Sequence, residues 1–154
     1  MNFDQQLDIY LRSRFTLIVL VTREEERLLE QARLLCEKTQ RPCLTWDVAD
    51  DFTWLANPTG NLPKARDPIT ALDQIDNFDD RKTTIFILKD FHDSWTNPQV
   101  KRKLRSVSQR LKFTKKCIFV TTPANMVPDE LKNEIVLFEF PAPGIKELEE
   151  ELNK

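Results

Sequence analysis

Glycine is almost absent from this sequence. Only two of the 154 residues are glycines, Gly60 and Gly144. A phosphate-binding loop needs glycines so that successive backbone N–H groups can close around phosphates, together with a lysine for their charge and a hydroxyl for the metal ion. Here the apolar run over 15–21 leads instead through three glutamates, residues 24–26, into a helical pattern. The sequence therefore excludes a phosphate-binding loop after its first predicted strand.

Long apolar runs and cysteines are also scarce. No stretch approaches the roughly 20 apolar residues of a membrane span, and no basic segment followed by an apolar one opens the chain. The cysteines, Cys36, Cys43 and Cys117, lack metal-site spacing and fall in an apolar helix face and two apolar strands. We therefore expect buried thiols, no membrane span and a reducing, cytoplasmic location.

Apolar segments alternate with helical patterns along the chain. Strands are predicted over residues 15–22, 43–48, 84–90, 117–122 and 135–140, and helices over 3–13, 24–39, 98–114, about 127–134 and from Asp67-Pro68 onward. Unbroken apolar runs indicate strands that are buried on both faces, and right-handed crossovers then place helices on both sides of a parallel sheet. We predict one α/β domain over 1–154, a three-layer sandwich with a five-stranded parallel sheet in the order 5-1-4-3-2.

Turn formers and caps complete this prediction. Residues 51–66 are rich in Asn, Pro and Gly, which predicts a flexible loop. Thr22 is expected to cap the helix over 24–39, and Asn97-Pro98 is expected to start the helix over 98–114. The end of the chain, about 144–154, is predicted as an acidic helix.

Charge is distributed unevenly along the chain. No Asp or Glu occurs over residues 94–128, where lysines and arginines cluster. The basic helix over 98–114 is therefore a candidate interaction surface, carried by Lys101, Arg102, Arg105 and Arg110. Clustered cations favour nucleic acid, anionic lipid or an acidic protein face, unless acids elsewhere in the fold balance them. The formal net charge of −2 favours the balanced or protein-facing interpretation.

Two tryptophans and one polar cluster are further candidates. Trp54 and Trp95 fall in loop-like segments, where they would either anchor a partner or pack back against the rim of the sheet. Asp90, His92 and Asp93 combine carboxylates with an imidazole, a donor set that suits divalent ions. A hydrogen-bonded loop accounts for the same spacing, so no metal ligand is assigned.

Several segments resemble parts of an AAA-type core. Residues 85–90 look like a Walker B strand, 121–123 like the end of a sensor strand, and 136–143 like the close of such a core. More specifically, residues 8–15 (DIYLRSRF), 88–93 (LKDFHD) and 138–141 (FEFP) resemble the amino-terminal region of an AAA ATPase family of cyanobacteria and algal plastids, known from a hypothetical plastid reading frame. The resemblance implies an AAA/RecA-like core that lacks a P-loop, with the working ATPase module further along the polypeptide.

Departures from a working ATPase limit what this resemblance implies. At the Walker-B-like position, Lys89 replaces the metal-holding Asp, and Asp90 stands at the position of the catalytic Glu. The segment 123–135 contains no arginine that could serve as a finger to a neighbour. No catalytic, cofactor-binding or metal-binding residue is therefore assigned, and no cofactor is expected.

The resulting hypothesis is a non-catalytic regulatory or assembly domain that contacts protein. In the family interpretation it positions an AAA motor module or self-associates in photosynthetic cells, in the cytoplasm or the plastid stroma. Two alternatives stay open. One is a nucleic-acid-binding module that uses the basic helix, and the other is a residual nucleotide-binding ATPase domain that rests on Asp90 and the fold.

Overall fold

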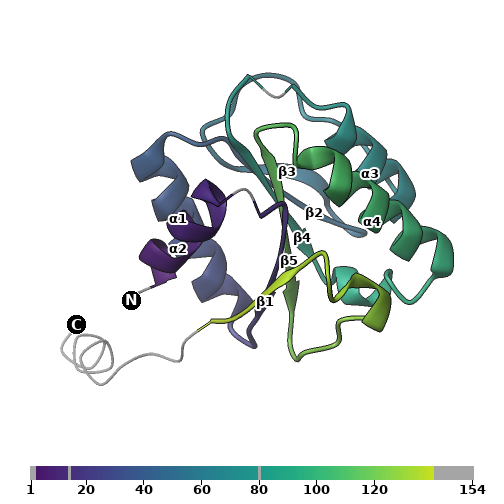
Figure 1. Cartoon of the computed structure of the whole chain (residues 1–154). Helices are drawn as coiled ribbons and strands as arrows, with labels where there is room; N and C mark the ends of the chain where they lie inside the picture. The colour runs from purple at the N-terminus through teal and green to yellow at the C-terminus, as the bar shows by residue number, and fades with distance from the viewer. Residues whose placement is uncertain (1–2, 14, 80, 141–154) are drawn as a thin grey trace.

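A six-stranded sheet organises the structure, a computed structural model that describes residues 3–13, 15–79 and 81–140 (Figure 1). Its strands are β1 (Leu17–Val21), β2 (Cys43–Asp47), β3 (Asp51–Ala56), β4 (Thr84–Lys89), β5 (Lys116–Thr122) and β6 (Val136–Glu139). They lie in the order β3-β2-β4-β5-β1-β6. All neighbours pair in parallel except β2 and β3. The sheet contains the five predicted strands in the predicted order. The predicted total of five was wrong, because β3 adds a sixth, antiparallel strand at the edge.

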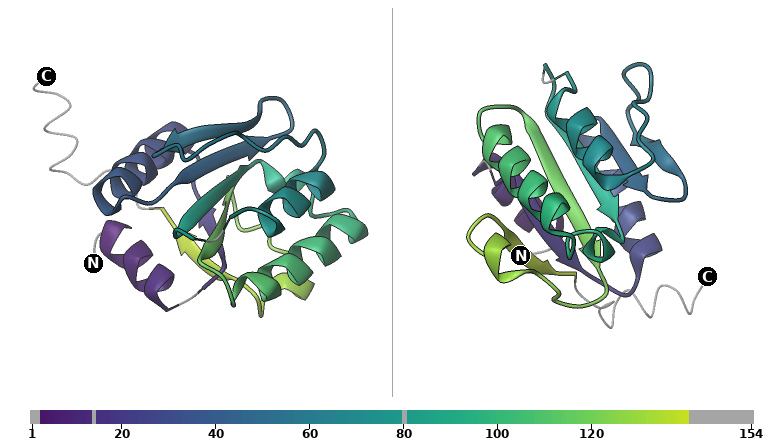
Figure 2. Two further views of the ribbon diagram at one scale, coloured as in Figure 1. Left: turned by 90° about the horizontal axis from the view of Figure 1, so that it is seen from above. Right: turned by 90° about the vertical axis from the view of Figure 1, so that its right-hand side faces the viewer.

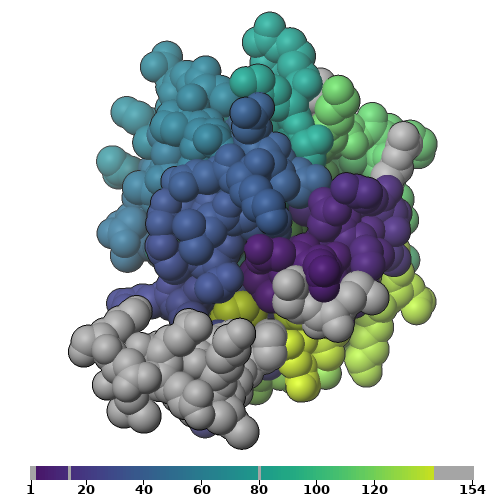
Figure 3. Space-filling model, turned by 90° about the vertical axis from the view of Figure 1, so that its left-hand side faces the viewer, coloured from purple at the N-terminus to yellow at the C-terminus, as the bar shows by residue number. Residues whose placement is uncertain are grey.

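Helices cover both faces of the sheet (Figure 2). The helices are α1 (Phe3–Arg12), α2 (Glu25–Thr39), α3 (Pro68–Asp76) and α4 (Pro98–Leu111). In the space-filling view α1 and α2 lie side by side (Figure 3). Two apolar clusters fill the two faces, because successive strand residues point to opposite sides. In β1, Ile18 and Leu20 join the cluster under α1 and α2, whereas Leu17 and Val19 join the cluster under α3 and α4.

Strand β3 lies inside the segment predicted as a flexible loop over 51–66. A tight turn makes it possible, because Asp47 Oδ1 accepts hydrogen bonds from the N–H groups of Ala49 and Asp50 at 2.9 and 2.7 Å. The chain then reverses and buries Phe52 beside Trp46. The prolines and glycine that suggested a loop come later, over 57–66, where the structure has no helix or strand. The loop prediction was therefore wrong for residues 51–56.

Helix starts follow the capping residues in two of three cases. Asp67 accepts a hydrogen bond from the Thr70 N–H at 2.8 Å, and Asn97 accepts one from the Gln99 N–H at 2.9 Å. Thr22 does not cap α2, which begins after Glu24. The Thr22 hydroxyl instead accepts a hydrogen bond from the Glu24 N–H at 2.9 Å, in the turn before the helix.

The segment between β5 and β6 contains less helix than predicted. The segment 127–134 contains only η2 (Asp129–Leu131), one turn of 3-10 helix, before β6. The acidic helix predicted for 144–154 lies outside the described residues. Among the helices that are described, none combines the length and the apolar character needed to cross a bilayer.

Candidate functional site

The carboxyl ends of β1, β4 and β5 meet at the edge where open α/β sheets bind their ligands. A cavity of about 360 Å³ lies there. Its lining residues come from the end of β5 and from the segments that follow these three strands: Thr22, Arg23, Glu25, Asp90, Thr121, Thr122 and Pro123. This is the position at which a P-loop would hold phosphates, so its chemistry decides whether a nucleotide fits.

Two carboxylates dominate this cavity. Glu25 stands in the first turn of α2, and its Oε2 lies 3.4 Å from the Thr121 hydroxyl. Burial raises the pKa of Glu25, and the negative charge of Asp90 raises it further. A phosphate at this helix start would add more negative charge to a place where one carboxylate already resists ionisation. Arg23 also lines the cavity, but the two carboxylates outnumber this cation, so the charge of the cavity disfavours a nucleotide's phosphates.

Of the two Walker-B-like residues, Lys89 forms an ion pair within the fold, whereas Asp90 is exposed. Lys89 Nζ lies 3.1 Å from Asp47 Oδ2, and both side chains are largely buried. Burial alone would raise the pKa of Asp47, but hydrogen bonds from the Asp50 N–H and from Lys89 outweigh it and lower that pKa. Asp90 is exposed and has a left-handed backbone with φ of 56°. The lysine thus forms an ion pair at the place where a magnesium ligand would stand.

The polar cluster after β4 does not form a metal site. His92 lies in η1 (Phe91–Asp93), and its Nε2 is 3.6 Å from an Asp93 carboxylate that is mostly exposed. Within the described ranges, no group of three or more His, Cys, Asp or Glu side chains gathers as metal ligands would. The cluster is better described as one turn of 3-10 helix at the end of a strand.

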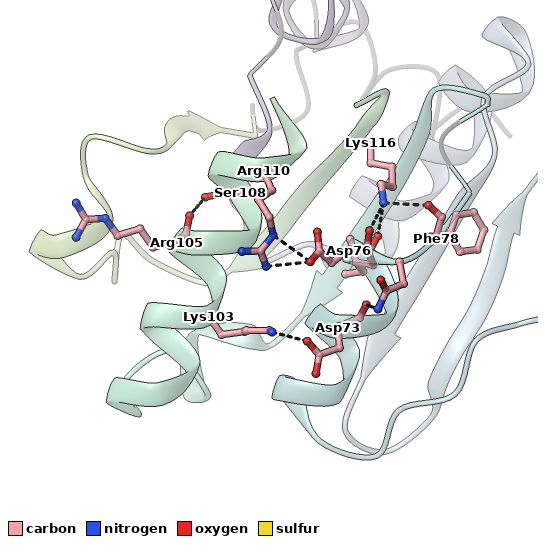
Figure 4. A network of polar contacts seen from close by, with 10 residues as sticks. Asp73, Asp76, Phe78, Lys103, Arg105, Ser108, Arg110 and Lys116 are labelled. Carbon is pink, nitrogen blue, oxygen red and sulfur yellow. Dashed lines mark hydrogen bonds and ion pairs between the residues drawn. The ribbon is translucent and has the colours of Figure 1, made fainter. Parts of the chain in front are cut away.

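The basic helix α4 is matched by acids from neighbouring elements. Lys101 pairs with Glu130 at 3.3 Å, and Arg105 lies 3.8 Å from Glu134. Arg110 pairs with Asp76 at the end of α3 at 2.9 Å (Figure 4). The structure therefore places these three candidate cations next to carboxylates rather than leaving them open to a polyanion.

Arg102 differs from the other three candidates on α4. Its side chain is exposed, and among the described residues no ion pair of it is found. It lies over an open groove of α3 and α4 together with Lys103, whose ammonium pairs with Asp73 (Figure 4). The four residues predicted as one surface therefore do not act as one charge cluster.

Neither tryptophan is an exposed anchor. Trp95 is only 1% exposed and belongs to the core under α3 and α4. Trp54 lies in β3, half-buried, with its ring 6.5 Å from that of Phe78. The prediction that Trp95 lies on an interaction surface was wrong, because the turn after Phe91 folds the indole back under the sheet.

Sequence reasoning missed the role of Lys116 and the exposure of Phe113. Lys116 is buried, and its ammonium donates to the carbonyls of Ile75, Asp76 and Phe78 at 2.7 to 2.9 Å (Figure 4). The positive charge thereby stabilises the carboxyl end of α3. The signal available was its position, since Lys116 is the first residue of β5 and every residue of that strand is buried.

Comparison with known sequences places this fold in a family. The sequence model described as "SpoVK-like AAA ATPase, N-terminal domain" matches residues 3–140. The chain belongs to this family. The family match confirms the resemblance drawn from residues 8–15, 88–93 and 138–141.

Two relatives show the extent of the similarity. A protein of Pyropia yezoensis named "Uncharacterized AAA domain-containing protein ycf46" is 36% identical over 155 residues, covering 99% of this chain. The protein of the same name from Trieres chinensis is 30% identical over 155 residues, covering 100% of this chain. In each case the match spans 31% of the relative's length. The chain thus corresponds to about a third of these AAA-domain proteins.

Proposed function

We propose that this domain is a non-catalytic regulatory or assembly domain of an AAA ATPase, which contacts protein and positions the ATPase module. The observation that carries the proposal is the carboxyl-edge cavity, which holds Glu25 and Asp90 where phosphate ligands would be needed. A domain that keeps the shape of a nucleotide-binding fold without its ligand chemistry remains available for protein contacts. The relatives are named as AAA-domain proteins, and the matched region spans only 31% of each, which supports an ATPase module elsewhere in the same polypeptide.

The expected partners are that module or a second copy of the chain. Ion pairs along α4 favour a protein partner over nucleic acid, because Lys101, Arg105 and Arg110 would have to leave carboxylates before they could bind phosphates. The matching algal relatives favour the plastid stroma, or the cytoplasm, of a photosynthetic cell as the location.

Cross-linking of the complete protein tests this function. A lysine-reactive cross-linker and mass spectrometry would be applied with and without magnesium–ATP, on a mixture of isotopically labelled and unlabelled protein. We expect cross-links from this domain to the ATPase module or to a second copy, and a change in them when ATP binds. Cross-links confined to the domain itself, identical in both nucleotide states, would contradict the proposal.

A further inference from the structure

A groove lies at the amino edge of the sheet, opposite the cavity that would hold a nucleotide. Its volume is about 550 Å³. The end of α1, the starts of β1 and β4 and the turn from α4 to β5 contribute its walls, with side chains that include Leu11, Arg12, Phe15, Arg81, Phe113 and Lys115. Apolar and cationic groups therefore meet in one depression.

Two aromatic rings are left in solvent at this groove. Phe113 is 90% exposed, in the turn where its N–H donates to the Arg110 carbonyl. Phe15 is 43% exposed, although Tyr10 packs edge-on against it at 5.8 Å. Aromatic side chains are enriched at protein interfaces, and exposed apolar clusters mark such surfaces. The rings thus mark a contact surface that nothing in the described structure covers.

The charge around the groove is positive. Arg12 and Arg81 pair with Asp8 and Asp79, yet their side chains remain 78% and 87% exposed. Among the described residues no ion pair of the exposed Lys115 ammonium is found, in contrast to the next residue, Lys116, whose ammonium is bound by carbonyls. These two arginines are more exposed than the paired cations of α4, Lys101, Arg105 and Arg110, which are 23 to 50% exposed. Exposed ion pairs hold their members weakly, so an acidic ligand can engage Arg12 and Arg81 at smaller cost.

The chain carries a segment of matching chemistry. Residues 145–152 place Ile145, Leu148 and Leu152 at the spacing of one helix side. The same segment contains the glutamates Glu147, Glu149, Glu150 and Glu151. An acidic segment with apolar residues complements a groove with two exposed rings and cations on its rim.

The distance from Phe140 to the groove bears on whether the segment of the same chain or that of a second copy docks there. The Phe140 N–H donates to Val21 O at the carboxyl edge, whereas the groove begins beside Phe15. Six residue steps of extended chain, from Phe15 to Val21, cover about 20 Å. The five steps from Phe140 to Ile145 reach at most about 18 Å. Even with the linker fully extended, a chain's own segment could bring only its later residues into the groove, whereas the segment of a second copy can lie there along its whole length.

We propose that residues 145–152 of a second copy dock in this groove, with their apolar side chains on Phe15 and Phe113 and their glutamates toward Arg12, Arg81 and Lys115. This deepens the proposed function, on which it rests, by naming the assembly surface. Each copy offers one groove and one acidic segment, so the contact is head-to-tail and builds a ring or a filament according to the rotation between copies.

Complementary variants of the full 154-residue chain test the contact by analytical ultracentrifugation. The groove variant is Phe113→Asp with Lys115→Glu, and the segment variant is Leu148→Asp with Glu150→Lys. Val48→Asp is the matched control, because Val48 is exposed on a different turn. We expect the wild type and the control to self-associate and each variant alone to associate at least about tenfold more weakly, equivalent to about 1.4 kcal/mol. An equimolar mixture of the two variants should recover heterodimers, because one intact groove then meets one intact segment.

Self-association that is unchanged in the groove variant, or a mixture that recovers nothing, would overturn the proposal. Single-stranded RNA that binds the wild type at physiological salt and is lost in the groove variant would assign the surface to nucleic acid instead. Thermal unfolding of both variants should match the wild type, since the substituted residues of the groove are exposed. A wild-type 154-residue chain that stays monomeric, while the same domain cross-links to the ATPase module in the complete protein, would refute this contact alone and leave the proposed function standing.

Discussion

The two edges of the sheet treat their charged residues in opposite ways. At the carboxyl edge, Lys89 pairs with Asp47, and Glu25 shares its cavity with Asp90. At the amino edge, Lys115 and Phe113 face solvent around a groove. In doubly wound folds the carboxyl edge is the ligand edge. The comparison teaches that a fold can keep that edge in shape while its lysine is paired and its carboxylates disfavour phosphate, which leaves a different surface open to partners.

Neighbouring lysines sharpen this comparison at the amino edge. Lys116 is the first residue of the buried strand β5, and its ammonium donates to three carbonyls at the end of α3, whereas Lys115 precedes the strand and is exposed. One lysine therefore serves the fold and the other is available for binding. Substituting each in turn separates the two roles.

Lys116→Met is expected to have the largest effect. It removes three charge-assisted hydrogen bonds and leaves the carbonyls of Ile75, Asp76 and Phe78 without that donor, so the free energy of unfolding should fall by about 2–3 kcal/mol. Lys115→Met is the control and should change it by less than about 0.5 kcal/mol. Urea denaturation followed by circular dichroism measures both. Equal losses in the two variants would break the distinction between the buried and the exposed lysine.

Asp90 allows a comparable test at the carboxyl edge. Its φ of 56° is a left-handed conformation that glycine adopts without strain and alanine does not. Both Asp90→Gly and Asp90→Ala remove the carboxylate, so their difference reports the backbone alone. We expect the glycine variant to be more stable than the alanine variant by about 1 kcal/mol in urea denaturation. The opposite order would show that the turn after β4 is not strained.

Glu25→Gln is expected to have the smallest effect and a dependence on pH. Burial, followed by the charge of Asp90, raises the pKa of Glu25 above its ordinary value of 4.5. The folded state therefore binds this proton more tightly than the unfolded state, and stability falls as pH rises from the unfolded pKa to the folded one. The glutamine variant should be more stable than wild type at pH 7 and lose that advantage below about pH 4.5.

Thermal unfolding across pH measures this difference. Glu26→Gln, an exposed position in the same helix turn, is the matched control and should give no such crossover. A gain for Glu25→Gln that is equally large at low pH would show that burial and the charge of Asp90 do not act on this carboxylate.

Sequence reasoning recovered the parallel strands and their order because four of them, β1, β2, β4 and β5, are buried on both faces and read as apolar runs, and because the edge strand β6 is also mostly apolar in sequence. Strand β3 escaped it because one face is exposed, as at Thr53, and because the prolines and glycine that follow suggested a loop. Local sequence pattern contains no information on the tight turn at Asp47 that brings β3 back onto β2.

The candidate site was harder to predict, because its properties depend on pairs that are distant in sequence. Asp47 and Lys89 lie on neighbouring strands, and Asp76 and Arg110 on neighbouring helices. A run of cations on one helix therefore suggested an open basic face that the fold largely neutralises. The absence of a phosphate-binding loop could be predicted without knowledge of such pairs, because the residues after β1 contain no glycine.

Titration of magnesium–ATP into the chain by isothermal calorimetry tests the central claim most directly. A P-loop ATPase measured under the same conditions is the positive control. We predict no saturable binding at micromolar concentrations, because Glu25 and Asp90 line the cavity where phosphates would bind and Lys89 is held by Asp47. Saturable micromolar binding that Asp90→Asn weakens would contradict the account and show that the carboxyl edge is a working nucleotide site.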